Sequence, residues 1–413
     1  MVKYILIAAL CGMLCSCATN SSSSQNDQSE LATNSEWGEN QPYVVLISFD
    51  GFRHDYARKY GAMNILSFME SGVSADKMIP SFPSKTFPNH YTLVTGMYPS
   101  THGLVSNEFY SREKDATYKV GDLATVHDAA WYGGKPLWVL AEEAGMLAAS
   151  YFWVGSEAPI GGRIPTYMKP YDGSIPNQER FEGVVDWLKL PAADRPHFMA
   201  VYFSVIDDVG HRYGPNSKQT EEAVLRLDQQ FGEFMDKLAK VNLPVNVILV
   251  ADHGMSEINR GVILDDIVDV SDCKVTWSFP PMIYSDDSIR INEIQSTINA
   301  DGRIAAWKPE ELPERLHLPA GDRVGDLILY TEAPLVILKK PQVVKGGTHG
   351  FNPYTNDDMG ALFAAQGPSF KSGINIEEFE NIHVFSVVAK ILGLESPDNV
   401  DGRLEELEPI LRE

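Results

Sequence analysis

The chain has 413 residues, 44% of them hydrophobic, which is enough to bury the core of one large α/β domain with a smaller insertion. Its formal net charge of −22 argues against nonspecific binding to polymeric nucleic acid, because such binding depends on Lys and Arg neutralising phosphates. The charge still permits a small anionic substrate, since bound divalent cations would dominate the local field at its site.

The N-terminus has the pattern of an export signal. Lys3 precedes an apolar stretch over 4–14, which is shorter than the ~20 residues of a transmembrane helix. The following Leu14-Cys15-Ser16-Cys17 is similar to a bacterial lipobox and predicts a signal peptide over 1–17 with lipidation at Cys17. An ordinary cleaved signal peptide is the alternative.

The next segment, 18–41, is rich in Ser, Asn, Gln and Glu and predicts a flexible tether. This leaves 42–413 as the folded domain. We expect an exported protein that a lipid holds on a bacterial membrane, the outer membrane in our interpretation, with the domain facing the periplasm or the cell surface.

Short apolar runs over 44–49, 198–205 and 245–251 are typical of parallel strands covered on both faces. Between the last two runs, apolar residues recur at helical spacing over 221–240. This alternation predicts an α/β fold with a mostly parallel central sheet and helices on both faces. The stretch 273–338 separates two of the motifs below, and we expect it to form a small α+β insertion.

Each of the three predicted strands is followed by an aspartate: Asp50, Asp207 or Asp252. Ligands of open α/β sheets bind outside the carboxyl ends of the strands, so these carboxylates are expected to converge. They would repel one another strongly unless cations lay among them, and zinc favours Asp and His ligands. Asp207 and His211 are four residues apart, which places both on one face of a helical turn.

Thr86 is predicted near the N-terminus of a helix that runs to about Thr95. The helix dipole and the free backbone N–H groups there favour a developing alkoxide. A threonine hydroxyl is a poor nucleophile at its free pKa, and metal coordination is one way to activate it. Taken alone, Thr86 is better explained as a helix cap; beside the Asp and His set, it predicts covalent catalysis.

Together these motifs resemble the nucleotide pyrophosphatase/phosphodiesterase family of the alkaline phosphatase superfamily, here as a bacterial lipoprotein member. The resemblance spans 44 to about 393 and rests on the order and spacing of the segments 50–53, 85–103, 152–156, 207–215, 251–255 and 348–353. It implies an alkaline-phosphatase-like three-layer sandwich. It also implies zinc-dependent hydrolysis of phosphodiester and pyrophosphate bonds, with release of nucleoside 5′-monophosphates.

The resemblance further implies the roles of individual residues. One zinc ion would be held by Asp50, Thr86, Asp252 and His253, and a second by Asp207, His211 and His349. Thr86 would form a covalent phosphothreonine, and Asn107 would hydrogen-bond a phosphate oxygen. The substrate-binding positions implied are Lys85, Phe87, Asn107, Tyr171 and Tyr202, with the three aromatic residues beside the base and sugar.

Several assignments have alternatives. Asp208 rivals Asp207, because the family commonly has Glu and then Pro shortly before its aspartate, where this chain has Ser204-Val205-Ile206. Tyr167 could take the place of Tyr171, Asn107 could be a turn former, and Phe87 or Tyr202 could be core residues. The histidines outside the motif set are predicted to be structural or exposed: His54, His90, His102, His127, His197, His317 and His383.

Other functions also fit the sequence. A diesterase of choline-type lipid headgroups is close to the nucleotide enzyme, and a phosphomonoesterase or a sulfatase of the same superfamily would share the metals. A non-catalytic binding lipoprotein is the alternative from a different class. The expected partners are a small phosphodiester or nucleotide substrate and, through the lipid, a membrane; the protein is expected to be a monomer.

Overall fold

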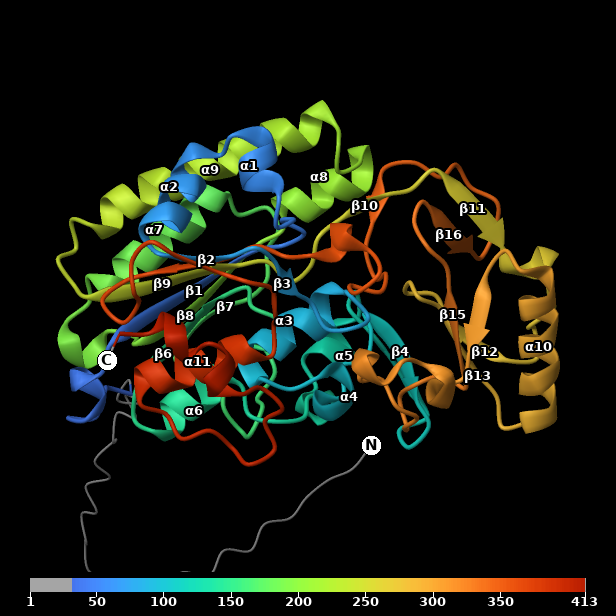
Figure 1. Cartoon of the computed structure of the whole chain (residues 1–413). Coiled ribbons are helices and arrows are strands. Elements are labelled where there is room, and N and C mark those ends of the chain that lie inside the picture. Colours follow the sequence, from blue (N-terminus) through green and yellow to red (C-terminus); the bar gives the residue numbers. More distant parts are fainter. Residues whose placement is uncertain (1–31, 413) are drawn as a thin grey trace, which may run out of the picture. The chain divides into compact units, whose positions relative to one another are not determined.

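The centre of the fold is an eight-stranded sheet, seen in a computed structural model that describes residues 32–412 (Figure 1). Its strands lie in the order β19 (Ile374–Ile376), β2 (Val73–Ala75), β18 (Phe363–Gln366), β9 (Val245–Val250), β1 (Tyr43–Phe49), β8 (Phe198–Phe203), β6 (Ala148–Tyr151) and β7 (Tyr167–Lys169). The five strands from β9 to β7 are parallel, whereas β18 is antiparallel to both of its neighbours. The predicted mostly parallel sheet is confirmed.

Strand β1 lies in the middle of the parallel part and is buried along its whole length. It pairs with β8 on one side and β9 on the other, with Ile47 opposite Val201 and Leu249. A strand covered on both faces has no polar side, which explains its continuous apolar run. Strand β8 ends at Phe203, two residues before the predicted end, because a helix begins at Val205.

Helices cover both faces of this sheet (Figure 1). One layer contains α2 (Met63–Ser71), α7 (Asn177–Leu188) and α9 (Lys218–Leu238), and the other contains α3 (Thr86–Thr95), α6 (Leu137–Glu143) and α11 (His383–Leu392). Helix α9 buries Val224, Leu227 and Phe231, residues of the helical pattern in the sequence. The three-layer arrangement is therefore confirmed.

The insertion forms a second sheet with its own core. Its strands lie in the order β12 (Lys274–Thr276), β13 (Met282–Tyr284), β15 (Leu327–Tyr330) and β14 (Ala305–Trp307), and α10 (Ser288–Asp301) packs beside them (Figure 1). This second core also takes in Val262 and Leu264. The insertion thus begins earlier than the predicted residue 273, because these upstream side chains pack into its core.

The folded domain also begins earlier than the predicted residue 42. Asn34 is 7% exposed, and its amide donates hydrogen bonds to the carbonyl oxygens of Ala192 and Arg195. Its Oδ1 accepts one from the backbone N–H of Leu147. The predicted signal peptide, its Cys17 and most of the predicted tether lie outside the described residues. Within residues 32–412, no helix is both long and apolar enough to cross a membrane.

Candidate active site

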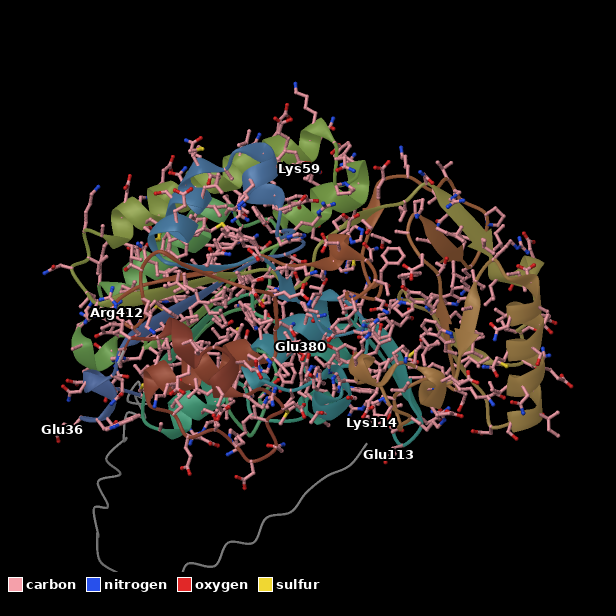
Figure 2. The ribbon with its side chains drawn as sticks, in the orientation of Figure 1. Glu36, Lys59, Glu113, Lys114, Glu380 and Arg412 are labelled. Carbon is pink, nitrogen blue, oxygen red and sulfur yellow. The ribbon has the colours of Figure 1, made fainter. Side chains whose placement is uncertain are left out.

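Charged side chains occupy two very different environments in this domain. Exposed ones such as Glu36, Lys59 and Glu113 lie on the outer surface (Figure 2). In contrast, Asp50 and Asp252 are 1% and 0% exposed. Asp50 directly follows β1, and Asp252 follows β9 by two residues. Since these parallel strands end at the same sheet edge, the two carboxylates meet there, as predicted.

His253 links the residues of the first predicted metal position. Its Nε2 lies 2.9 Å from Asp252 Oδ2, 3.5 Å from Asp50 Oδ1 and 3.3 Å from the Thr86 hydroxyl oxygen. Asp50, Asp252 and His253 therefore form one group whose ligand atoms could hold a metal ion. The structure brings Thr86 to the same place.

The second predicted position centres on Asp207, in the first turn of α8 (Val205–Tyr213). Its carboxylate lies 3.4 Å from His211 Nε2 and 3.6 Å from His349 Nε2. His253 borders this position too, because its ring stacks on His349 with the ring centroids 3.5 Å apart. Asp208 is exposed and belongs to neither metal-binding group of the described residues, so the geometry favours Asp207 over its rival.

Backbone carbonyl groups fix the orientation of all three histidines. The Nδ1–H groups of His211, His253 and His349 donate to the carbonyl oxygens of Gly347, Gly254 and Ser84, at 2.9, 2.8 and 2.7 Å respectively. Each Nε2 is then left with a lone pair that faces the site, the orientation of a metal-binding histidine. The Nε2 atoms of His211 and His349 are 3.2 Å apart, where two lone pairs repel unless a cation lies near them.

One oxygen of each site carboxylate lacks a hydrogen-bond donor of its own. Asp50 Oδ1, Asp207 Oδ1 and Asp252 Oδ2 are buried without a hydrogen bond among the described residues. Burial, followed by the charges of Asp252 and Asp207, raises the pKa of Asp50 well above its usual range. Burial alone would raise the pKa of Asp252 as well, but His253 and His90 hold it well below its usual range.

These observations test whether zinc fits the site. Buried carboxylates are normally paired or bound to a metal, and orphaned carboxylate oxygens facing imidazole lone pairs are the donor set that zinc prefers. The residues therefore fit the ion. One position would be held by Asp50, Asp252, His253 and Thr86, and the other by Asp207, His211 and His349.

Thr86 begins α3, which runs to Thr95 as predicted. Its backbone lies among the first free N–H groups of that helix, where the dipole favours negative charge. The preceding Lys85 is 7% exposed, and its ammonium makes no ion pair or hydrogen bond within residues 32–412. Burial lowers the pKa of Lys85 to about 8, against the opposing effect of Asp207 and the other site carboxylates.

Asn107 precedes the hairpin of β4 (Glu108–Ser111) and β5 (Ala116–Lys119) and reaches the start of α3. Its Oδ1 accepts a hydrogen bond from the backbone N–H of Phe87 at 2.9 Å. The side-chain NH2 group is then the part that can donate to a substrate. The predicted oxyanion role is compatible with this geometry, and the bond to Phe87 explains how the amide would be oriented.

The three predicted aromatic residues lie in different settings. Phe87 is half-buried, and Tyr171 is 54% exposed with its ring 6.4 Å from that of Tyr202. Tyr202 itself is only 9% exposed, and its hydroxyl donates to Asp50 Oδ2 at 2.6 Å. Tyr202 therefore supports a candidate metal ligand from within the core and does not present a face for base stacking. The rival Tyr167 instead donates its hydroxyl to the Asp194 carbonyl and packs its ring against Trp187.

Sequence reasoning assigned His90 no place at the site, yet its fully buried ring lies against it. The Nδ1 atom is 2.9 Å from the Thr86 carbonyl oxygen and 3.3 Å from Asp252 Oδ2. The signal was present in the sequence, because His90 follows Thr86 by four residues within a predicted helix and so shares its face.

The chain is similar to known proteins over most of its length. A family model described as "Type I phosphodiesterase / nucleotide pyrophosphatase" matches residues 44–352. Ectonucleotide pyrophosphatase/phosphodiesterase family member 1 of Homo sapiens is 34% identical over 376 residues, which cover 87% of this chain and 40% of that protein. Venom phosphodiesterase CdcPDE of Crotalus durissus collilineatus is 35% identical over 400 residues, or 92% and 48% of the two chains. The chain thus spans less than half the length of these curated relatives.

Solved structures agree with the fold. Murine ectonucleotide pyrophosphatase/phosphodiesterase 5, solved as an inactive threonine-to-alanine variant in complex with AMP, superposes with a TM-score of 0.85 at 26% identity. The match covers 90% of this chain and all of that one. The human protein of the same name gives the same values.

Proposed function

The chain belongs to the type I phosphodiesterase/nucleotide pyrophosphatase family, and from that premise we propose that it hydrolyses phosphodiester and pyrophosphate bonds of nucleotides and releases nucleoside 5′-monophosphates. One observation carries the proposal: the Thr86 hydroxyl, at the start of α3, lies 3.3 Å from His253 within a set of zinc-type ligands. The inactive threonine variant and the bound AMP of the murine relative support a threonine nucleophile and a nucleotide substrate.

Each residue of the site has a role in this proposal. Bound zinc would supply Lewis acidity at the nucleophile and at the leaving oxygen. The α3 N-terminus favours the alkoxide form of Thr86. The Asn107 amide, oriented by Phe87, donates to a non-bridging phosphate oxygen. The buried Lys85 ammonium adds positive charge beside the phosphate.

The reaction proceeds in two displacements. Thr86 loses its hydroxyl proton, its Oγ1 attacks phosphorus, and the bond to the leaving oxygen breaks; the leaving oxygen departs with the electron pair and takes up a proton from solvent. Water then attacks the phosphothreonine, which releases the nucleoside monophosphate and restores the Thr86 hydroxyl. The fixed ligands limit the rearrangement of the protein between these steps, and this preorganisation lowers the barrier.

A substrate panel tests the proposal. Zinc-loaded protein would be assayed with a thymidine monophosphate aryl ester, ATP, a bis-aryl phosphate, an aryl monophosphate and glycerophosphocholine. We expect the highest kcat/KM for the two nucleotide substrates. A clear preference for the aryl monophosphate would replace the proposal with a phosphomonoesterase, and a preference for glycerophosphocholine would replace it with a lipid-headgroup diesterase.

We also propose that the protein is exported and held on a bacterial membrane by a lipid on Cys17. The support is the lipobox-like Leu14-Cys15-Ser16-Cys17 followed by a polar segment. Metabolic labelling with a radioactive fatty acid should mark the wild-type protein and leave Cys17→Ser unlabelled. Equal labelling of the two, or none, would contradict the anchor without bearing on the hydrolase activity.

A further inference from the structure

We propose that His90 is a positioning residue that holds the Thr86 backbone and the Asp252 carboxylate in their working arrangement, with its own ring orientation set by Ser48. The inference rests on the proposed function, because it assigns His90 a part in organising the zinc site. It concerns a residue that donates no ligand atom to either metal-binding group.

The ring of His90 connects three elements of the domain. His90 lies in α3, four residues after Thr86, and its Nδ1 is 2.9 Å from the Thr86 carbonyl oxygen. The same Nδ1 is 3.3 Å from Asp252 Oδ2, beyond the end of β9. On the opposite side of the ring, Nε2 is 2.8 Å from the hydroxyl of Ser48, which belongs to β1.

These contacts fix the tautomer of the ring. A carbonyl oxygen can only accept, so Nδ1 carries the proton that it donates to Thr86, and the same N–H dipole faces the Asp252 carboxylate. The lone pair of Nε2 then accepts the hydroxyl proton of Ser48. Ser48 is the one serine in the otherwise apolar strand β1 and is completely buried. Burying its hydroxyl without a hydrogen bond would cost free energy, and His90 supplies the acceptor for that bond.

The ring has little freedom to leave this position. It is 0% exposed and packs edge-to-face between Trp153 and Tyr202, with centroid distances of 5.2 and 5.1 Å. Tyr202 also donates to Asp50. His90 thus contacts Asp252, and Tyr202 contacts Asp50. The two rings also pack against each other, so both carboxylates of the first metal position are supported by one packed group of side chains.

Some residues of the site would therefore bind the metal, and others hold those ligands in place. Asp252 Oδ1 accepts a hydrogen bond from the Gly51 backbone at 3.1 Å, while Oδ2 faces His90 and His253. Removing His90 frees one side of that carboxylate and loosens the first turn of α3. Partners of this kind typically change metal affinity by ~10–100-fold when they are removed.

The test uses the full chain and compares two buried histidines. His90→Leu deletes the contacts, His90→Asn retains a donor near the place of Nδ1, and Ser48→Ala removes the group that orients the ring. The matched control is His102→Leu. His102 is also 0% exposed, packs against Tyr91 and bonds to Thr92, but touches no candidate ligand among the described residues. Zinc affinity is measured by chelator competition, alongside thermal unfolding, kcat and KM.

We expect His90→Leu to weaken zinc binding by ~10–100-fold, Ser48→Ala to weaken it less, and His90→Asn to recover part of the loss. At saturating zinc, His90→Leu should lower kcat and leave KM nearly unchanged, because Thr86 moves while the substrate contacts stay. His102→Leu should lose thermal stability only. If His90→Leu fails to fold, the zinc affinities of Ser48→Ala and His90→Asn are compared with that of the wild type instead.

Equal zinc affinity in the wild type, Ser48→Ala and His90→Asn would overturn the inference, and so would equal losses in His90→Leu and His102→Leu. The affinity measurement needs no substrate. A wild-type protein that binds zinc but hydrolyses no nucleotide would therefore overturn the proposed function. The zinc affinities of the variants would still test the role of His90 in that case.

Discussion

Thr86 combines three properties at one position: it begins α3, it follows a buried lysine, and its hydroxyl lies 3.3 Å from His253. The N-cap of α3 is Lys85, so Thr86 is the first residue of the helix and does not cap it. The approach of the hydroxyl to His253 is what distinguishes a nucleophile from a cap, and it depends on elements far apart in the chain.

Replacing Thr86 separates these two roles. Thr86→Ala should reduce turnover by several orders of magnitude, because the covalent step is lost, and Thr86→Ser should retain part of the activity. The free energy of unfolding should change little in both variants. If Thr86 were a helix cap, its replacement by Ala would lower that free energy by about 1 kcal/mol. Steady-state kinetics and thermal unfolding provide the measurements. Near-normal turnover in Thr86→Ala would mean that water attacks phosphorus directly.

Phe87, at the start of α3, is one of two predicted base-stacking residues that the structure leaves accessible, and the other is Tyr171. If its ring stacks on a base, the contact should be worth ~1–3 kcal/mol. Phe87→Ala should then lower kcat/KM for a thymidine monophosphate aryl ester by roughly ten- to a hundredfold, at ~1.4 kcal/mol per factor of ten. A bis-aryl phosphate without a base serves as the control substrate. Equal losses on both would assign Phe87 a packing role through its neighbour Tyr118.

Among the elements, the short strand β17 (Gly347–Thr348) joins two candidate ligands of the second metal position, His211 and His349. It pairs with β10 (Ser256–Glu257), accepts the hydrogen bond of His211 and leads directly to His349. The approach is close because Gly346 has φ of +89°, and a Cβ there would lie 2.1 Å from the His211 carbonyl oxygen. Only a glycine fits this position without moving one of the two segments.

Gly346→Ala should therefore displace β17 from α8 and weaken zinc binding at the position of Asp207, His211 and His349. We expect zinc content, measured by atomic emission after gel filtration at limiting zinc, to fall by about one ion per chain relative to the wild type. Gly302→Ala is the matched control, because Gly302 also has a positive φ of +77° but a Cβ there meets nothing within 4 Å. Both variants carry the backbone strain of about 1–2 kcal/mol, and only Gly346→Ala should lose metal.

At the scale of the whole molecule, the stability of the domain should depend on zinc and pH through its buried carboxylates. Burial and the neighbouring negative charges of Asp252 and Asp207, which raise the pKa of Asp50, also make its ionised form destabilising in the metal-free protein. An aspartate has an unfolded pKa of about 3.9, so this cost appears as pH rises above that value. Bound zinc would reverse the sign, because the same charge would then bind the ion.

Asp50→Asn should consequently stabilise the metal-free protein relative to the wild type, by an amount that grows as pH rises from about 4 towards neutral. In excess zinc the wild type should be the more stable of the two, because the variant lacks a ligand. Zinc binding adds RT ln(1 + [Zn]/Kd) to the free energy of unfolding of the wild type, which is ~2.7 kcal/mol at a hundredfold excess over Kd. Urea unfolding with chelator and with zinc at several pH values measures both effects. A variant less stable than the wild type under all conditions would show that Asp50 has a purely structural role.

The sequence by itself determined the parallel strands and the helix that begins at Thr86, and it predicted candidate ligands that the structure brings together. Those features depend on local patterns: a fully buried strand is continuously apolar, a helix repeats its apolar residues at fixed spacing, and the motif residues follow directly where strands end. For this reason Asp50, Asp207 and Asp252 could be placed at one sheet edge before any coordinates were known.

The tertiary structure decided what depends on contacts between distant segments. Asn34 belongs to the folded domain because it bonds to residues near 147 and 192–195, and Val262 belongs to the insertion because it packs into that core. Tyr202 supports Asp50, and His90 lies between Thr86, Asp252 and Ser48. No local pattern encodes these partners, because a buried polar side chain is satisfied by whichever group the fold brings to it.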